Sequence, residues 1–201
     1  SAYAVAAQSI YMVRQAFTDA IQTNISYEAG LVDLKRVLGN VTDNDMKAFG
    51  AQAIQMAKDF GEPIQSVQDA MNALAAAGVQ DKASLSGMTN TVMLALNTSD
   101  LTDANTATEL LTSSMKQMGI SYSDSEKVLD SWNASADKHI AKTSDYAKAV
   151  SKAGLTSKIM GISLNELNGI ISVMADNTGK SGEAIGRSEE RRVGKECSQG
   201  V

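Results

Sequence analysis

An eighteen-residue stretch, Met160–Asn177, combines the end of one helix, a tight turn and the beginning of the next helix. Gly161 can adopt the positive φ that a helix C-terminus favours. Ser163 and Glu166 have the spacing of a capping box, in which each side chain satisfies a backbone N–H of the first helical turn. Apolar residues then recur at helical spacing, which predicts one buried face: Leu164, Leu167, Ile170, Ile171 and Met174.

The same segment has a polar face, formed by Asn165, Asn168 and Ser172. If the leucines and isoleucines are buried in a helical bundle, this polar face is the surface that remains for partners. We therefore expect these three side chains to be exposed.

Two other glycines, Gly61 and Gly119, have similar surroundings and predict similar turns. The residue two positions later is Pro63 or Ser121, as a first-turn proline or a cap. Thirteen positions after the glycine stand Leu74, Trp132 and Met174, which we expect to pack in a core. Gly61, Gly119 and Gly161 lie 58 and then 42 residues apart, and this unequal spacing argues against a strict solenoid repeat. Gly78 and Gly179 are further predicted turn residues.

Composition favours an all-α fold. The chain of 201 residues has 28 alanines and one proline, and aromatic residues make up 4%. Alanine is the best helix former, and small side chains allow helices to pack closely. Period-2 apolar runs typical of strands are nearly absent. We predict a bundle of about eight short antiparallel helices joined by Gly, Ser or Asp turns, with a longer helix as an option at the N-terminus.

Three segments are expected along the chain. Residues 1–39 form an N-terminal helical region, and residues 40–186 form a helical core module. The chain begins at Ser1 within a helical pattern, so we interpret it as a fragment. From Arg187 to Cys197 the sequence RSEERRVGKEC resembles the translation of a sequencing-adaptor oligonucleotide. We therefore interpret residues 187–201 as a non-native tail and draw no redox role from Cys197, the only cysteine.

Several classes of function lack a sequence signal. The net charge is −5 and no basic run occurs before residue 187, so a nucleic-acid site is not expected. The only histidine, His139, falls in a predicted turn, and Asp43-Asn44-Asp45 lacks the glycine and distal glutamate of an EF-hand loop. We therefore predict no catalytic residue, no metal site and no cofactor. The ten methionines are expected to fill the core, or alternatively to form an adaptable partner-facing surface.

Three motifs together resemble the tape measure proteins of long-tailed bacteriophages. They are Leu74–Val79, Met118–Ser121 and above all Met160–Gly186 (MGISLNELNGIISVMADNTGKSGEAIG). The resemblance is to the conserved core region named after a lactococcal phage tail protein, and it covers roughly Tyr27–Gly186. The order and spacing of the motifs carry the match, because each motif alone is common helix punctuation. Asn177-Thr178 departs from the family, which more often has small residues there.

The resemblance implies a structural, non-enzymatic role in the virion tail. Such proteins are packed in the growing tail tube, set its length and leave it at infection. The implied partners are the tail tube protein, tail assembly chaperones and tail-tip proteins, with self-association as a further expectation. Assembly is expected in the host cytoplasm, and contact with the host membrane only at infection.

Frequent turns predict that this segment is a compact module and that the measuring length lies elsewhere in the protein. A rod would need helices that continue at about 1.5 Å per residue. Two alternatives remain open on the sequence alone: a generic helical protein-interaction module and a membrane-active helical domain.

Overall fold

The computed structural model describes residues 15, 18, 23–179 and 185 of the chain. Alanine-rich segments with few helix breakers form helices over most of these residues. A first helix runs through residues 23–38. The elements that follow are α2 (Asp43–Phe60), α3 (Ile64–Ala76), α4 (Lys82–Thr98), α5 (Ala104–Met118), the short 3₁₀ helix η1 (Tyr122–Asp124), α6 (Ser125–Ala136), α7 (Thr143–Ile159) and α8 (Leu164–Thr178). Within the described residues there is no strand, so the all-α prediction is confirmed. The tail at residues 187–201 and most of residues 1–22 lie outside the described part.

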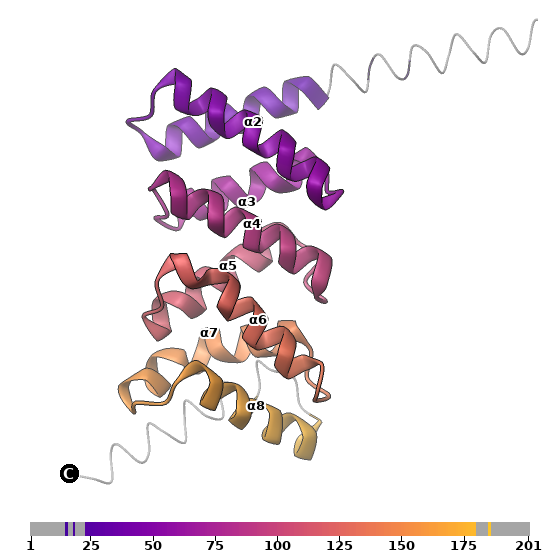
Figure 1. Ribbon diagram of the computed structural model, residues 1–201, viewed down its shortest axis with the longest axis vertical. Coiled ribbons are helices and arrows are strands. Elements are labelled where there is room, and N and C mark those ends of the chain that lie inside the picture. The colour runs from indigo at the N-terminus through magenta and orange to yellow at the C-terminus, as the bar shows by residue number, and fades with distance from the viewer. Residues whose placement is uncertain (1–14, 16–17, 19–22, 180–184, 186–201) are drawn as a thin grey trace, which may run out of the picture.

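The helices form a stack of antiparallel hairpins in two layers (Figure 1). One layer contains α3, α5 and α7, and the other contains α2, α4, α6 and α8; within each layer successive helices pack on one another. Turns after α3, α5 and α7 lie along the left edge of Figure 1, and turns after α2, α4 and α6 along the right edge. Helices of the second layer begin at nearly constant intervals, at residues 43, 82, 125 and 164. The chain therefore adds one hairpin to the stack for about every 40 residues, as in an α-solenoid.

The regular stack corrects the expectation from glycine spacing. Four glycines with positive φ mark the left-edge turns at intervals of 39, 41 and 42 residues: Gly39, Gly78, Gly119 and Gly161. Gly61 instead ends α2 and belongs to a right-edge turn. Grouping Gly61 with Gly119 and Gly161 was wrong, and so was the argument against a solenoid that rested on it. The reason is physical: a glycine C-cap serves a helix of either layer equally well, so its local sequence does not reveal the direction of the helix.

Three of the left-edge turns share one hydrogen-bond geometry. The apolar residue after each glycine donates its backbone N–H to a carbonyl five residues earlier: Val79 to Leu74 at 3.0 Å, Ile120 to Met115 at 2.9 Å, and Ile162 to Ser157 at 2.9 Å. This is the Schellman arrangement, which satisfies helix-end carbonyls and turns the next residue inward. Each left-edge turn therefore starts the next hairpin in a similar direction.

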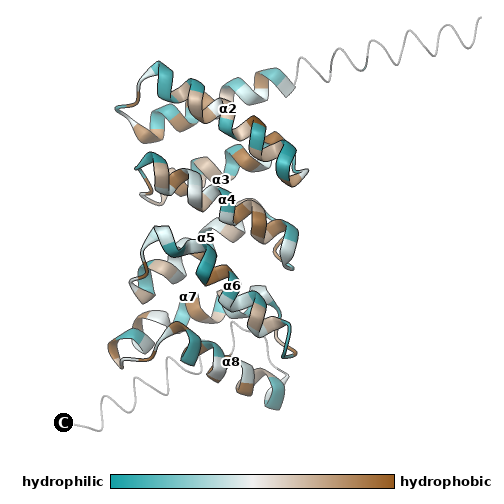
Figure 2. Cartoon of the chain, in the orientation of Figure 1, coloured by the Kyte–Doolittle hydropathy of each residue, from teal (hydrophilic) through white to brown (hydrophobic). Residues whose placement is uncertain are grey.

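Amphipathic helices form a continuous core between the layers. Each helix in Figure 2 carries both hydrophobic and hydrophilic residues. The bulkiest buried side chains, Trp132, Tyr146 and Phe49, are accompanied mainly by leucine, methionine, valine and alanine. Small residues let α5 and α7 approach closely: a Cβ on Gly154 would lie 3.2 Å from Gln117 Cβ and 3.3 Å from Met118 Cγ. The close packing of small residues that the composition suggested is therefore present at this contact.

Candidate functional site

The glycines that the sequence marked as turns all have positive φ. Gly61, Gly119 and Gly179 are the C-caps of α2, α5 and α8, with φ values of 68°, 66° and 61°. Gly78 and Gly161 follow the ends of α3 and α7, with φ values of 95° and 77°. Gly61, Gly78, Gly119 and Gly161 reverse the chain, and Gly179 ends α8; none of these glycines carries chemistry of its own.

The three cap candidates behave differently. Ser163 accepts a hydrogen bond from the backbone N–H of Glu166 at 3.3 Å, and the Glu166 carboxylate accepts from the backbone N–H of Ser163 at 2.8 Å. Hydrogen bonds from Ser163 lower the pKa of Glu166 below its usual value. Pro63 occupies the position just before α3 and not its first helical turn. Ser121 precedes η1 but makes no capping bond, because its hydroxyl lies 2.9 Å from the hydroxyl of Ser123.

Most of the predicted packing residues are in the core. Leu74, Trp132, Leu167 and Ile171 are buried. Ile170 is half-buried, and Met174 is half-buried against the core cluster.

The proposed polar surface of α8 is wrong for two of its three residues. Asn168 and Ser172 are each only 2% exposed, whereas Asn165 is exposed. The helix packs on both α6 and α7, so its buried arc extends beyond the apolar stripe. Asn168 Nδ2 donates to Ser131 Oγ at 2.8 Å, and the hydroxyls of Ser172 and Tyr146 lie 2.7 Å apart. These bonds offset the cost of burying the polar groups.

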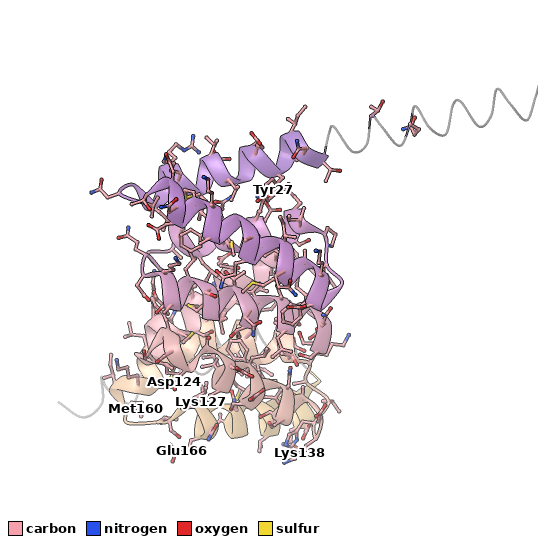
Figure 3. All side chains as sticks on the ribbon, turned by 45° about the horizontal axis from the view of Figure 1, so that its top comes forward. Tyr27, Asp124, Lys127, Lys138, Met160 and Glu166 are labelled. Carbon is pink, nitrogen blue, oxygen red and sulfur yellow. The ribbon has the colours of Figure 1, made fainter. Side chains whose placement is uncertain are left out.

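A groove of about 620 Å³ opens on the left edge, between the last two left-edge turns. Its apolar floor consists of Met118, Ile120, Val128, Ile162 and Leu164. Its polar rim consists of Asp124, Lys127, Ser131, Lys158, Ser163 and Asn165. Asp124 and Lys127 form an exposed ion pair at 2.7 Å, and Figure 3 shows them on the side of the stack that carries Met160 and Glu166.

The groove lies beside a turn that differs from its equivalents. Val79, the residue after Gly78, is 1% exposed, whereas its counterparts Ile120 and Ile162 are half-buried. Between Gly119 and α6 the chain inserts η1, so α6 begins six residues after its glycine, whereas α8 begins three residues after Gly161. Sequence reasoning did not select Lys127 or Lys158; the extra residues between Gly119 and α6 indicated only an irregular turn.

A second hollow of about 560 Å³ continues between α6 and α8 and shares Lys127, Ser131 and Asn165 with the first. It reaches His139, whose Nδ1 lies 2.7 Å from Asp176 Oδ2. This contact lowers the pKa of Asp176, and Asp176 also accepts the backbone N–H of Ile140 at 3.2 Å. His139 therefore fastens the α6–α7 turn to the end of α8.

No cluster of three or more His, Cys, Asp or Glu side chains that could hold a metal occurs in the described part of the chain. Asp45 forms a capping box with Thr42, and Asp43 pairs with Lys35 at 2.7 Å. Over the same residues, none of the helices has the length and apolar character needed to cross a bilayer. The geometry offers turns, a groove and apolar surfaces, which are means of association.

The sequence is similar to proteins of bacteriophage tails. The profile of the family described as phage-related minor tail protein matches residues 50–189. The chain is 25% identical over 165 residues to the tape measure protein of Pneumococcus phage Dp-1, which covers 82% of this chain and 14% of that protein. No solved structure matches the chain.

Proposed function

The chain belongs to the phage-related minor tail protein family, and we propose that it is part of a tape measure protein that acts in tail assembly and tail-length determination. Within the tape measure proteins we assign it to the lactococcal-type core region. The proposed location is the virion tail, after assembly in the host cytoplasm, with release through the tail tube at infection. The proposed role is structural and non-enzymatic. The proposed partners are the tail tube protein, tail assembly chaperones and tail-tip proteins.

The observation that carries this proposal is the family match, which extends over α3 to α8 and thus over most of the hairpin stack. The similarity to a phage tape measure protein covers much of the same chain. The helical architecture of the described residues also supports it, because the tape measure family that the sequence resembles is largely helical. The present chain spans only 14% of that relative, so the measuring length can lie outside it.

We further propose that residues 40–186 act as a compact module of the tape measure and not as an extended ruler. Packed helices lie about 8–10 Å apart, so a stacked hairpin of about 40 residues adds roughly 10 Å. The same residues in one continuous helix would add about 60 Å. The stack therefore supports a role in docking and assembly more than in measuring.

Tail length after deletion of one hairpin tests this proposal. Deleting the codons for residues 120–161 from the phage genome joins Gly119 to Ile162, so that the Gly-Ile-Ser sequence of the turn is restored. We expect tails that are shortened by the height of one stacked hairpin, about 10 Å, in averaged electron micrographs. Shortening by about 60 Å would mean that the segment measures as an extended helix and would refute the compact module. If mass spectrometry of purified tails of normal length detected no peptide of this protein, the tail role itself would be refuted.

A further inference from the structure

The groove on the left edge lies between two consecutive hairpins and not at an end of the stack. One wall comes from residues 118–131 and the other from residues 158–165, and all of these residues are described. Its apolar floor is only partly covered by the chain, because Ile120, Ile162 and Leu164 are half-buried. The groove therefore offers apolar surface inside the stack that the stack itself does not fill.

A lysine in each of the last two hairpins reaches back to the preceding left-edge turn. Lys116 and Lys158 each stand three residues before a left-edge glycine. Lys116 Nζ donates to the carbonyl of Ala77, at the end of α3. Lys158 takes the equivalent course, since a Cβ on Gly119 would collide with its ammonium nitrogen. Among the described residues, however, Lys158 forms no hydrogen bond or ion pair.

The carboxylates beside the groove have other partners than Lys158. Asp124 pairs with Lys127 at 2.7 Å. Glu166 accepts from the backbone N–H and the hydroxyl of Ser163 at 2.8 and 2.7 Å, so its charge lies at the beginning of α8. The charged residues that line the groove are two lysines and one aspartate, in a chain whose net charge is −5. An excess positive charge beside apolar side chains is complementary to a ligand that is both apolar and negatively charged.

The polar rim favours a peptide segment over a fatty acid. The hydroxyl of Ser131 donates to the side-chain oxygen of Asn165 at 2.8 Å, which leaves the amide nitrogen of Asn165 as a donor for a peptide carbonyl. The groove continues into the second hollow between α6 and α8, where no described atom lies within 4 Å of a Cβ built on Gly169. This glycine leaves room for another backbone to approach. Both features suit a chain that carries polar backbone groups.

We propose that the groove binds a short segment of a partner protein in which apolar side chains stand next to an aspartate or glutamate. The apolar side chains lie on Ile120, Ile162 and Leu164, and the carboxylate pairs with Lys158. Asn165 donates to the backbone of the segment. This binding does not depend on the tail role, because it rests on the groove alone and is measured on the purified chain.

Selection from a displayed library of short random peptides tests this proposal on the full chain. Peptides are kept if they bind the wild-type protein and discarded if they also bind Lys158→Glu. We expect the peptides that remain to combine leucine, isoleucine or methionine with aspartate or glutamate. If no peptide remained, or if the remaining peptides lacked an acidic residue, the proposal would be overturned.

Fluorescence anisotropy with a synthetic copy of a selected peptide measures the contribution of the charge. Lys158→Ala should weaken binding about fivefold, the upper range for an exposed ion pair, and Lys158→Glu at least tenfold. Lys152→Glu is the matched control, since Lys152 is an exposed lysine of the same helix that does not line the groove, and it should bind like the wild type. A peptide whose acidic residue is replaced by lysine should prefer Lys158→Glu to the wild type. Equal affinity of this peptide for both proteins would exclude the ion pair and overturn the proposal.

Methyl NMR spectra show where the selected peptide binds. The methyl resonances of Ile120 and Ile162 should shift when the peptide is added, whereas those of Ile54, an exposed isoleucine of α2, should not. Shifts that occur only outside the groove would place the contact elsewhere and overturn the proposal. Circular dichroism of each variant verifies that it is folded.

Discussion

Gly154 allows α7 to contact α5 more closely than any larger residue would permit. A Cβ there would lie 3.2 Å from Gln117 Cβ and 3.3 Å from Met118 Cγ, and a leucine would have to displace both helices. Overpacking of this kind costs about 1–3 kcal/mol. We therefore expect Gly154→Leu to lower the free energy of unfolding by about that amount, measured by urea denaturation.

Gly169 provides the opposite control, because no atom lies within 4 Å of a Cβ built on it. Gly169→Ala replaces a flexible residue inside α8 and should raise the free energy of unfolding by about 0.5–1 kcal/mol. If both substitutions changed stability in the same direction, steric contact at Gly154 would not be the cause.

Single residues were also where sequence reasoning was least reliable. The sequence around Gly154 does not reveal its close contact, because Gln117, the nearest neighbour of a Cβ there, is 37 residues away along the chain. Asn168 and Ser172 were expected at the surface because they are polar, although inside the stack Asn168 Nδ2 donates to Ser131 and the Ser172 hydroxyl pairs with that of Tyr146. Burial depends on neighbouring helices, and a single helix does not encode the identity of its neighbours.

At the scale of one element, the beginning of α8 depends on its capping box. Ser163→Ala removes a side-chain acceptor for the Glu166 N–H, which typically costs about 1 kcal/mol. Ser163 also lowers the pKa of Glu166 below the usual 4.5. A carboxylate whose pKa is lowered by folding contributes stability above pH 4.5 that is lost as the pH falls through its folded value.

The difference in unfolding free energy between wild type and Ser163→Ala should therefore be largest at pH 7 and should shrink below pH 4.5. Other carboxylates titrate in both proteins and cancel in the difference. Urea denaturation at pH 7 and pH 3 measures it. A difference that is equal at both pH values would mean that the Glu166 carboxylate takes no part in the cap.

Element boundaries were accessible to sequence because glycines, caps and apolar spacing are local signals. The direction of each helix was not, because Gly61 and Gly119 have the same turn chemistry at opposite edges of the stack. A series of glycines at 39, 41 and 42 residues was present in the sequence, but only the arrangement of helices selects it from the other glycines. The groove beside η1 was missed for a related reason, since two segments far apart along the chain, around residues 118–131 and 158–165, line it together.

For the whole molecule, the nearly constant length of the hairpins predicts that one hairpin can be removed without loss of the fold. In a solenoid each hairpin contacts mainly its neighbours, so stability is roughly a sum over hairpins and interfaces. Deleting residues 120–161 removes α6 and α7 and brings α8 into the place of α6, next to α5. The shortened protein should keep its helicity per residue and unfold cooperatively. Its urea m-value should fall by about a quarter, in proportion to the surface removed.

A smaller deletion should be more damaging if it breaks the alternation of helices between the two layers. Comparing the two deletions therefore distinguishes the effect of this alternation from the effect of the number of residues removed. Removing residues 120–141 joins α5 directly to α7, two helices of the same layer that contact each other side by side. A tight turn at Gly119 reverses the chain, so it cannot connect two helices that run in the same direction. We expect this variant to lose cooperative unfolding and helicity, although it lacks fewer residues than the hairpin deletion. Circular dichroism and urea denaturation of both variants decide the matter, because a fold held together by general apolar burial would tolerate the smaller deletion better.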